Sequence, residues 1–483
     1  MTQPTGLEGQ INEAFGGIVA ALASVMFWEI PGLGMPLVVF WLGAGAVYFT
    51  LRMAFVNVRL FRHAIDVVRG RYDNPDEPGE VTHFQALSAA LSATVGLGNI
   101  AGVAVAVAIG GPGAVFWMNI AALFGMTSKF VECTLGLKYR VIDAQGAVNG
   151  GPMQYLHHGL QKRGMGGFGR FLAVLFAVLC IGGSFGGGNM FQVGQSYGAV
   201  AAVLPFELSR SVYGLLMAAA VGVVILGGIR SIAKVADKIV PFMVGLYGAA
   251  ALYVVVTHLG EVPTAIQRIV GEAFAPVSVA GGAIGVLIQG VKRAAFSNEA
   301  GVGSASIAHA AARTAEPVRE GVVALIEPFI DTVIVCSMTG IVMVLTGVCE
   351  DPANAALVAN KEGAALTAVA FASVLPWFPI ILAICVFLFA YSTMISWSYY
   401  GERCSTYLFG PRASMPYKVL FLVCVYIGAV SSMSNVLDFS DLMVLGMAFP
   451  NVIGLLLLSG EVRADLDTYI AKLRAGKFRV FRS

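Results

Sequence analysis

The sequence predicts an all-α membrane protein that crosses the bilayer many times and contains two inverted repeats. Of its 483 residues, 57% are hydrophobic and only 12% are charged, whereas soluble domains carry about 25% charged residues. A globular chain of this length cannot bury so much apolar surface in one core, so the class is a polytopic membrane protein. Two predicted spans are interrupted by glycine and polar residues, at 93–102 and 296–305. Such breaks are tolerated where they line a cavity.

The apolar runs predict eleven transmembrane helices. The first span covers 36–55, and the short apolar segment before it, at 17–28, is expected to lie at the membrane interface. The other spans are predicted at 84–109, 113–137, 168–204, 212–228, 239–258, 281–312, 318–347, 364–400, 416–432 and 438–459. Two of them, 168–204 and 364–400, exceed the ~20 residues that a span needs, so they are expected to tilt or to extend beyond the bilayer.

The ten spans after the first divide into two groups of five. The sequence therefore predicts an N-terminal part at 1–83 with the interfacial segment, one extra helix and a loop, a first repeat at 84–258, a second repeat at 281–459 and a basic cytoplasmic tail at 460–483. An odd number of spans per repeat places the repeats in opposite orientations, which is the inverted-repeat arrangement. Each repeat begins with an interrupted span.

Positive charge is distributed unequally between alternating loops. Arg and Lys residues gather in one set of loops, for example at 52–71 and 463–482, whereas the opposite set holds little beyond Arg210, Arg268 and Lys361. Cytoplasmic loops carry the excess of Lys and Arg. The N-terminus is therefore predicted outside, the C-terminus in the cytoplasm, and the protein in the cell inner (plasma) membrane.

The remaining composition gives no sign of an enzyme or of a nucleic-acid partner. The net charge is +2, and the seven cysteines are scattered singly without metal-ligand spacing. His157 and His158 are adjacent in a predicted cytoplasmic loop, and His309 stands alone. No nucleophile and base occur together in a catalytic pattern, so neither catalysis nor an organic cofactor is expected.

Both interrupted spans have a functional and a structural interpretation. The segment around Gly98 is either an unwound stretch whose amides face an anion and whose carbonyls face a cation, or a close-packing face formed by Gly98 and Gly102. Glu299 is either an ionisable group of functional importance within the membrane or a loop residue at a helix end.

Further polar residues lie within other predicted spans. Asn189 and Gln192 share one helix face and either line a site or form interhelical hydrogen bonds. Ser392 and Thr393 are expected either to contact a ligand or to bond back to the preceding helical turn. Trp397 is either an interfacial anchor or the cap of a pocket.

Four charged residues are expected to be neutralised by their neighbours. Lys129 and Glu132, spaced i and i+3, are predicted to form a pair, because an unpaired charge within a membrane is costly. Glu327 and Asp331, spaced i and i+4, need a raised pKa, a cation or a Lys/Arg partner. Their position near the cytoplasmic entry of the span favours solvation by water, and a proton relay is the alternative.

Several motifs, in order and with similar spacing over residues 36–460, resemble the alanine or glycine:cation symporter family. They are Ala93-Thr-Val-Gly-Leu-Gly-Asn-Ile-Ala-Gly-Val-Ala104, Gly110-Gly-Pro-Gly-Ala-Val-Phe-Trp117, Gly125-Met-Thr-Ser-Lys-Phe-Val-Glu132, Gly188-Asn-Met-Phe-Gln192, Phe296-Ser-Asn-Glu-Ala-Gly301, Glu327-Pro-Phe-Ile-Asp-Thr332, Trp397-Ser-Tyr-Tyr-Gly-Glu-Arg403 and Pro450-Asn451. This resemblance implies a LeuT-type 5+5 inverted-repeat core after one extra N-terminal helix. It also implies sodium-coupled uptake of alanine or glycine by alternating access.

The resemblance assigns the substrate site residue by residue. It implies that the amides of Leu97 and Gly98 hold the substrate carboxylate and that Asn189 or Gln192 holds the amino group. Phe296 and Trp397 would close the pocket and restrict the substrate side chain to a hydrogen or a methyl group. At position 97 the family often has threonine, so its hydroxyl is absent here and the carboxylate is left to backbone amides.

The resemblance also implies one sodium site between two helices. The ion would lie between backbone carbonyls near Ser92 and Val95 and the hydroxyls of Ser392 and Thr393, an all-oxygen set suited to an alkali cation. The expected partners are therefore a small neutral amino acid, the sodium ion and the lipid bilayer.

Two other functions remain open at this point. One is a proton-coupled symporter of the same fold, in which Glu299 or the pair Glu327 and Asp331 titrates. The other is a channel, which is disfavoured because channels need a continuous polar pore and the polar residues here gather at one depth.

Overall fold

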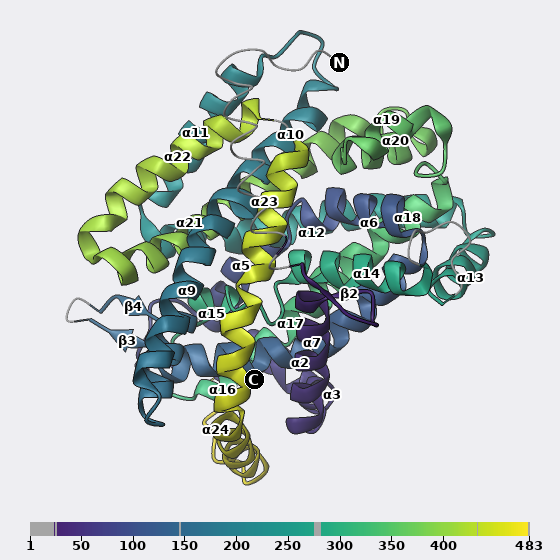
Figure 1. Ribbon diagram of the computed structural model, residues 1–483. Coiled ribbons are helices and arrows are strands. Elements are labelled where there is room, and N and C mark those ends of the chain that lie inside the picture. Colours follow the sequence, from purple (N-terminus) through teal and green to yellow (C-terminus); the bar gives the residue numbers. More distant parts are fainter. Residues whose placement is uncertain (1–23, 25–26, 144–145, 275–281, 432, 482–483) are drawn as a thin grey trace.

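The computed structural model describes residues 24, 27–143, 146–274, 282–431 and 433–481, and these parts are mostly helical (Figure 1). The expected interfacial segment at 17–28 falls largely outside the described residues. Short 3₁₀ or π-helical stretches are labelled η.

The first half of the chain contains α2 (Leu37–Arg52), α3 (Val56–Arg59), α4 (Phe61–Val68), α5 (His83–Thr94), η1 (Gly98–Gly102), α6 (Val103–Gly110), α7 (Gly113–Lys138), α8 (Pro152–Gln154), η2 (Tyr155–Gly159), α9 (Gly166–Phe185), η3 (Gly186–Met190), α10 (Phe191–Ala201), α11 (Arg210–Ile225) and α12 (Gly228–Thr257). The second half contains α13 (Val262–Glu272), α14 (Gly282–Asn298), α15 (Ala305–His309), α16 (Pro317–Ala324), α17 (Ile326–Pro328), η4 (Phe329–Cys336), α18 (Ser337–Thr346), η5 (Pro352–Asn354), α19 (Ala355–Ala359), α20 (Gly363–Val374), α21 (Phe378–Phe409), η6 (Pro411–Ala413), α22 (Ser414–Val430), α23 (Met433–Gly446) and α24 (Ala448–Arg474). Two antiparallel hairpins pair β1 (Glu29–Ile30) with β2 (Met35–Pro36) and β3 (Val141–Ile142) with β4 (Val148–Asn149).

Seven helices of the described chain are long and apolar enough to cross a membrane. The bent pair α5 and η1–α6 makes an eighth candidate, and α2, α11 and α20 are shorter apolar helices. The fold class of the sequence analysis is therefore confirmed at the level of a polytopic helical protein, while the number eleven stays a prediction.

Both predicted helix breaks are present. Helix α5 begins with a capping box between Thr82 and Gln85, and the chain leaves helical geometry at Val95 and resumes at Gly98 with a bend of 51°. The second break follows Asn298, where φ is +56° at Glu299. Positive φ is uncommon for residues other than glycine, so Glu299 is held there by its surroundings.

The predicted single span at 364–400 is wrong in one respect, because it consists of two helices. Helix α20 ends at Val374, Leu375 is extended, and α21 begins at Phe378. Pro376 lies in the gap, and proline both lacks an amide hydrogen and disfavours helical geometry in the residue before it. The proline explains the break.

The predicted basic tail at 460–483 begins inside a helix. Helix α24 passes 460 without a break and runs to Arg474, and Leu466 and Tyr469 on it are buried. Beyond it, the amide of Phe481 donates to the carbonyl of Arg71 at 2.9 Å. This part of the chain therefore packs against the loops that precede α5.

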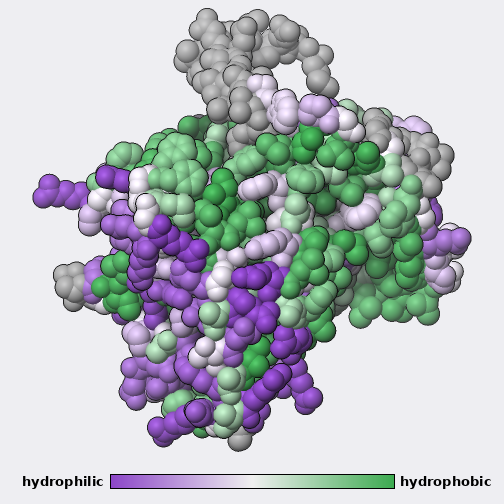
Figure 2. All heavy atoms as spheres, turned by 60° about the horizontal axis from the view of Figure 1, so that its bottom comes forward, coloured by the Kyte–Doolittle hydropathy of each residue, from purple (hydrophilic) through white to green (hydrophobic). Residues whose placement is uncertain are grey.

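The surface is divided between two kinds of residue. Figure 2 shows hydrophilic residues gathered over the end of the molecule that carries the C-terminal part of α24, beside a broad hydrophobic surface. Exposed apolar side chains such as Leu215, Leu216 and Val223 on α11 contribute to the apolar exterior of the protein. This distribution fits a protein whose sides face lipid.

The close approach of α20 to the first broken helix gives a prediction. A methyl group on Gly363 would collide with the backbone of Ala101, which cannot move like a side chain, so Gly363→Ala is expected to destabilise the fold by about 1–3 kcal/mol. The apparent melting temperature of the purified protein measures this. Gly245→Ala is the control, since a methyl group there meets no atom within 4 Å. Equal melting temperatures for the two variants would contradict the packing described.

Candidate substrate and ion site

A small cavity lies where the two helix breaks meet. Its lining consists of Ala93, Thr94, Gly98, Gly187, Gln192, Phe296, Glu299, Thr393, Trp397 and Val444. The cavity volume is about 10 Å³, close to the minimum that holds one water molecule. Side chains therefore close the site in this conformation. Five of the residues that the sequence analysis singles out for substrate or sodium contact the cavity.

The two amide side chains of the predicted substrate site differ in position. Gln192 lines the cavity, where its Oε1 accepts from the Leu97 amide at 3.1 Å and its Nε2 donates to the Gly187 carbonyl at 2.8 Å. Asn189 is not among the lining residues and donates to the Phe421 carbonyl on α22 at 2.7 Å. The structural alternative, an interhelical hydrogen bond, thus describes Asn189, whereas Gln192 joins the first break to η3.

Phe296 and Trp397 are the two aromatic residues that line the cavity. The Phe296 ring packs edge-on against Phe191, with centroids 5.5 Å apart. The indole Nε1 of Trp397 donates to Glu299 at 3.0 Å, and the ring lies so close to Gly188 that a Cβ there would overlap it. Trp397 is only 3% exposed, so it caps the pocket rather than anchoring the protein at the interface. The glycine run before Asn189 provides room for this ring.

The four residues predicted to hold sodium lie together where α5 meets α21. The hydroxyl of Ser92 donates to the Ser392 carbonyl at 2.7 Å, and the hydroxyl of Thr393 donates to the Ser92 carbonyl at 3.1 Å. Val95 is the residue at which α5 leaves helical geometry. The Ser392 hydroxyl bonds back to the Phe389 carbonyl at 3.0 Å. The group consists of neutral oxygen atoms, which suit an alkali cation.

A buried carboxylate that the sequence analysis did not place at the site joins the two breaks. Asn99 Nδ2 lies 2.5 Å from Asp331 Oδ1, and the Ser297 hydroxyl donates to Asp331 Oδ2 at 2.8 Å. Asn99 Oδ1 in turn accepts from the Gly96 amide at 2.9 Å. Polar groups without a hydrogen-bond partner cost free energy in an apolar interior. In this network the Gly96 amide, which the break exposes, is bonded to Asn99. The close-packing alternative fails for Gly102, where an added Cβ would meet only the carbonyl of Leu97 on the same helical segment.

Glu299 is both a residue of the break and a wall of the cavity. Its carboxylate accepts from Trp397 Nε1 and from the Ser304 hydroxyl, and the residue is 1% exposed. These two donors come from α21 and from the residue before α15. The carboxylate is therefore an ordered part of the site and not a solvated loop group.

The predicted ion pair of Lys129 and Glu132 is present at 4.0 Å, and Lys129 lies closer still to Glu327, at 2.9 Å. One expectation about charged residues is corrected. Glu327 and Asp331 are fully buried, so water does not solvate them as expected. Glu327 is instead neutralised by Lys129, and Asp331 is hydrogen-bonded by Asn99 and Ser297. These partners lie on other helices, so spacing within one helix does not reveal them.

The fold and the paired breaks around a closed site define a secondary transporter rather than an enzyme. A solved structure shares the fold: MhsT in complex with L-phenylalanine matches with a TM-score of 0.54, covering 79% of this chain and 89% of that chain at 15% identity. This likeness shows the LeuT-type fold.

The sequence pattern of the sodium:alanine symporter family matches residues 19–483, and the chain belongs to this family. It is 40% identical to the sodium/alanine symporter AgcS of Methanococcus maripaludis, covering 90% of this chain and 94% of that protein. It is 37% identical to the probable sodium/glutamine symporter GlnT of Bacillus subtilis, covering 90% and 88%. The resemblance inferred from the motifs is thereby confirmed.

The hydrogen bonds by which Asn99 joins the Gly96 amide to Asp331 give a prediction about stability. Asn99→Ala removes the acceptor of the Gly96 amide and one donor to Asp331, so it leaves buried polar groups unpaired and is expected to cost about 1–3 kcal/mol. The melting temperature in detergent measures the loss. Asn360→Ala is the control, because Asn360 is exposed. If both variants have the melting temperature of the wild-type protein, these hydrogen bonds do not stabilise the two breaks.

Proposed function

We propose that the chain takes up alanine or glycine together with sodium by alternating access. The observation that carries this proposal is the junction of α5 and α21, where a neutral oxygen cluster directly adjoins the cavity through Thr393. In the proposal, sodium binds the carbonyls near Ser92 and Val95 and the hydroxyls of Ser392 and Thr393. Ion binding would then fix the geometry of the first break and so complete the substrate site.

The amino acid would bind at the first break. The half-helix that begins at Gly98 directs amides with positive partial charge towards the cavity, which favours a carboxylate. The Leu97 amide is bonded to Gln192 Oε1 in this conformation, so substrate binding by this amide requires Gln192 to turn. Gln192 is then free to accept from the substrate ammonium group. Asn189 would act indirectly, because its hydrogen bond to the Phe421 carbonyl holds α22 against η3.

Phe296 and Trp397 support a small substrate. Their rings line the cavity together with Gly98 and Gly187. The cavity must widen to admit any amino acid, and the two rings would still leave little room around the substrate side chain. GlnT is named for glutamine, a longer side chain. We assign alanine or glycine here because two bulky rings confine the site.

The membrane arrangement completes the proposal. Eleven spans, with α2 as the extra helix and with repeats at 84–258 and 281–459, would place the hydrophilic end of Figure 2 in the cytoplasm. One sodium ion moving down a potential of ~100 mV supplies ~2.3 kcal/mol. At about 1.4 kcal/mol per decade, that supports roughly fifty-fold accumulation of the amino acid.

Proton coupling is the second candidate, and Glu299 is the observation that favours it. A buried carboxylate that lines the cavity and accepts a hydrogen bond from the Trp397 indole is a suitable proton acceptor. In that case a pH gradient would drive uptake without sodium, and Glu299→Gln would abolish this drive.

The sodium site gives a prediction. Ser392→Ala combined with Thr393→Ala removes two oxygen ligands, so the sodium concentration for half-maximal alanine uptake is expected to rise at least about tenfold, equivalent to ~1.4 kcal/mol. Ser398→Ala on the same helix is the control, because its hydroxyl bonds only to the Ile395 carbonyl of its own helix. An unchanged sodium dependence in the double variant would remove the proposed ion site.

The aromatic wall gives a second prediction. Phe296→Ala enlarges the cavity, so larger neutral amino acids such as leucine are expected to compete with labelled alanine at concentrations roughly tenfold lower than for the wild-type protein. Phe168→Ala, at an exposed position on α9, should leave the competition pattern unaltered. A wild-type pattern in Phe296→Ala would show that Phe296 does not limit substrate size.

A further inference from the structure

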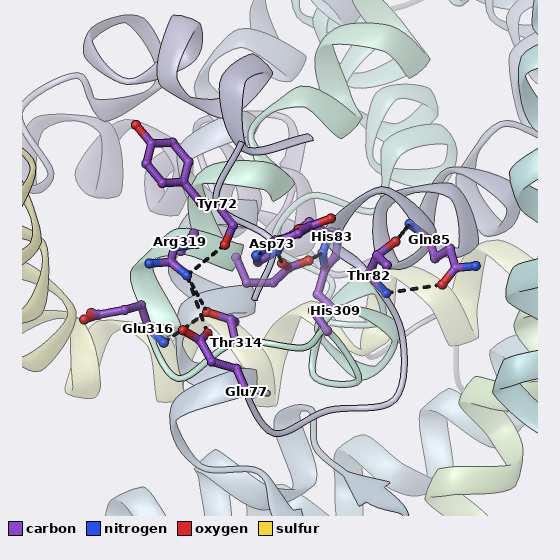
Figure 3. Close-up of polar contacts among 12 residues, drawn as sticks. Tyr72, Asp73, Glu77, Thr82, His83, Gln85, His309, Thr314, Glu316 and Arg319 are labelled. Carbon is purple, nitrogen blue, oxygen red and sulfur yellow. Dashed lines mark hydrogen bonds and ion pairs between the residues drawn. The ribbon is translucent and has the colours of Figure 1, made fainter. Parts of the chain in front are cut away.

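One buried carboxylate joins the ends of both broken helices. Glu320 on α16 accepts a hydrogen bond through Oε2 from Nδ1 of His83, the first residue of α5. Its Oε1 accepts from Nδ1 of His309, the last residue of α15, at 2.6 Å. Figure 3 shows His83 and His309 close together, each on a different segment of the chain. All three residues are fully buried.

The contacts continue in both directions from this centre. His83 Nε2 lies 3.8 Å from Asp73 Oδ1, and Asp73 is about one-third exposed. His309 Nε2 lies 3.5 Å from Glu327 Oε2, whose other oxygen is 2.9 Å from Lys129 Nζ. A chain of alternating acidic and basic groups thus extends from the exposed loop before α5 into the interior. Burial raises the pKa of the Asp73 carboxyl, which suits a group that exchanges protons at the surface end.

The hydrogen-bond directions require a second proton on each ring. An ionised carboxylate only accepts, so the Nδ1 atoms that contact Glu320 both carry hydrogen. A neutral imidazole would then present the bare lone pair of Nε2 to a second carboxylate, Asp73 for His83 and Glu327 for His309. An imidazolium presents an N–H group there instead. The geometry around both rings therefore favours the doubly protonated form.

Charge balance leads to the same result. The chain of contacts holds three acidic groups, Asp73, Glu320 and Glu327, and three basic groups, His83, His309 and Lys129. With the acids ionised, it carries two negative charges if the rings are neutral, and none if both rings are protonated. Uncompensated charge in an apolar interior is costly. Two protons on His83 and His309 remove it.

Other charged or titratable groups near this chain do not take over that role. Arg140, beyond α7, donates to the carbonyls of Pro78, Ala310, Ala312 and Thr314. Arg319 donates to the Tyr72 carbonyl and to Glu77 (Figure 3). The groups that also face the chain electrostatically are Arg313 and Arg319 near Asp73, Arg140 near Glu320, Cys133, Asp331 and Tyr400 near Glu327, and Glu299 near Lys129.

We propose that His83, Glu320 and His309 form a proton-binding site that locks the inner ends of the two broken helices together. With both rings protonated, charge-assisted hydrogen bonds hold α5 and α15 to α16, and the path towards this face stays closed. Loss of a ring proton leaves a bare nitrogen opposite a carboxylate and loosens the lock. A higher pH on this face then speeds opening towards it. The inference rests on the proposed function, in which this face is cytoplasmic and opens to release substrate.

The protonation state can be measured without transport. Solid-state nitrogen NMR of protein labelled at its six histidines reports each ring as neutral or doubly protonated. In the wild-type protein at about pH 7, where a free histidine is mostly neutral, two imidazolium signals are expected from the geometry of the cluster. His83→Gln and His309→Gln should each remove one or both of them. His258→Gln is the control, since the His258 ring bonds to Val254 and Thr257 at the end of its own helix, and should leave them in place. Absence of imidazolium signals in the wild-type protein would overturn the proposal.

The lock itself is tested by alanine uptake into right-side-out membrane vesicles. With the external pH and the sodium gradient fixed, the internal pH is varied from about 6 to about 8. The initial rate is expected to rise several-fold, the size of effect that loss of a charge-assisted hydrogen bond produces. The same rise is expected for His258→Gln. The rates of His83→Gln and His309→Gln should change less than about twofold, since glutamine can donate to Glu320 but takes up no proton.

The two measurements distinguish failure of this inference from failure of the proposed function. If wild-type vesicles take up no alanine, the proposed function fails, and the NMR signals alone decide whether the cluster binds protons. If uptake occurs but is independent of internal pH, or if both glutamine variants keep the wild-type dependence, the lock is disproved.

Discussion

The structure depends on satisfying backbone polar groups at two helix breaks inside an apolar protein. A broken helix exposes amides and carbonyls that have no water to bind in a membrane. Here Asn99 binds the Gly96 amide and Asp331, and Asp331 also accepts from Ser297 beside the second break. One buried carboxylate thus stabilises both breaks at once. The positions of the cavity, the proposed sodium ligands and the aromatic walls all follow from that fixed geometry.

Small residues then allow the breaks to be surrounded closely. Gly188 leaves room for the Trp397 ring, and a Cβ on Gly96 would collide with the Thr393 hydroxyl. The same closeness brings the hydroxyl-bearing part of α21 against the end of α5. The glycines therefore serve both the packing and the site, because Trp397 and Thr393 reach the cavity where the facing backbone, at Gly188 and Gly96, carries no side chain.

The sequence predicted this arrangement well wherever the signal was local. Glycine and polar residues inside an apolar run revealed both breaks, and motif spacing revealed the family. The resemblance to the family also placed Ser92 beside Ser392 and Thr393. Other contacts between distant segments were not predicted: the hydrogen bonds of Asp331 with Asn99, the pairing of Lys129 with Glu327, and the contact of His309 with Glu320 all join residues on different helices. The break before α21 was missed although Pro376 marks it, because the apolar character on both sides suggested a continuous span.

The measurement that tests the central claim most directly is uptake of labelled alanine by the purified protein in liposomes, at fixed pH, with and without an inward sodium gradient. The account predicts accumulation above the external concentration only when the gradient is present, because the ion completes the substrate site. Uptake that is indifferent to sodium but follows a pH gradient would contradict it and would transfer the coupling to Glu299.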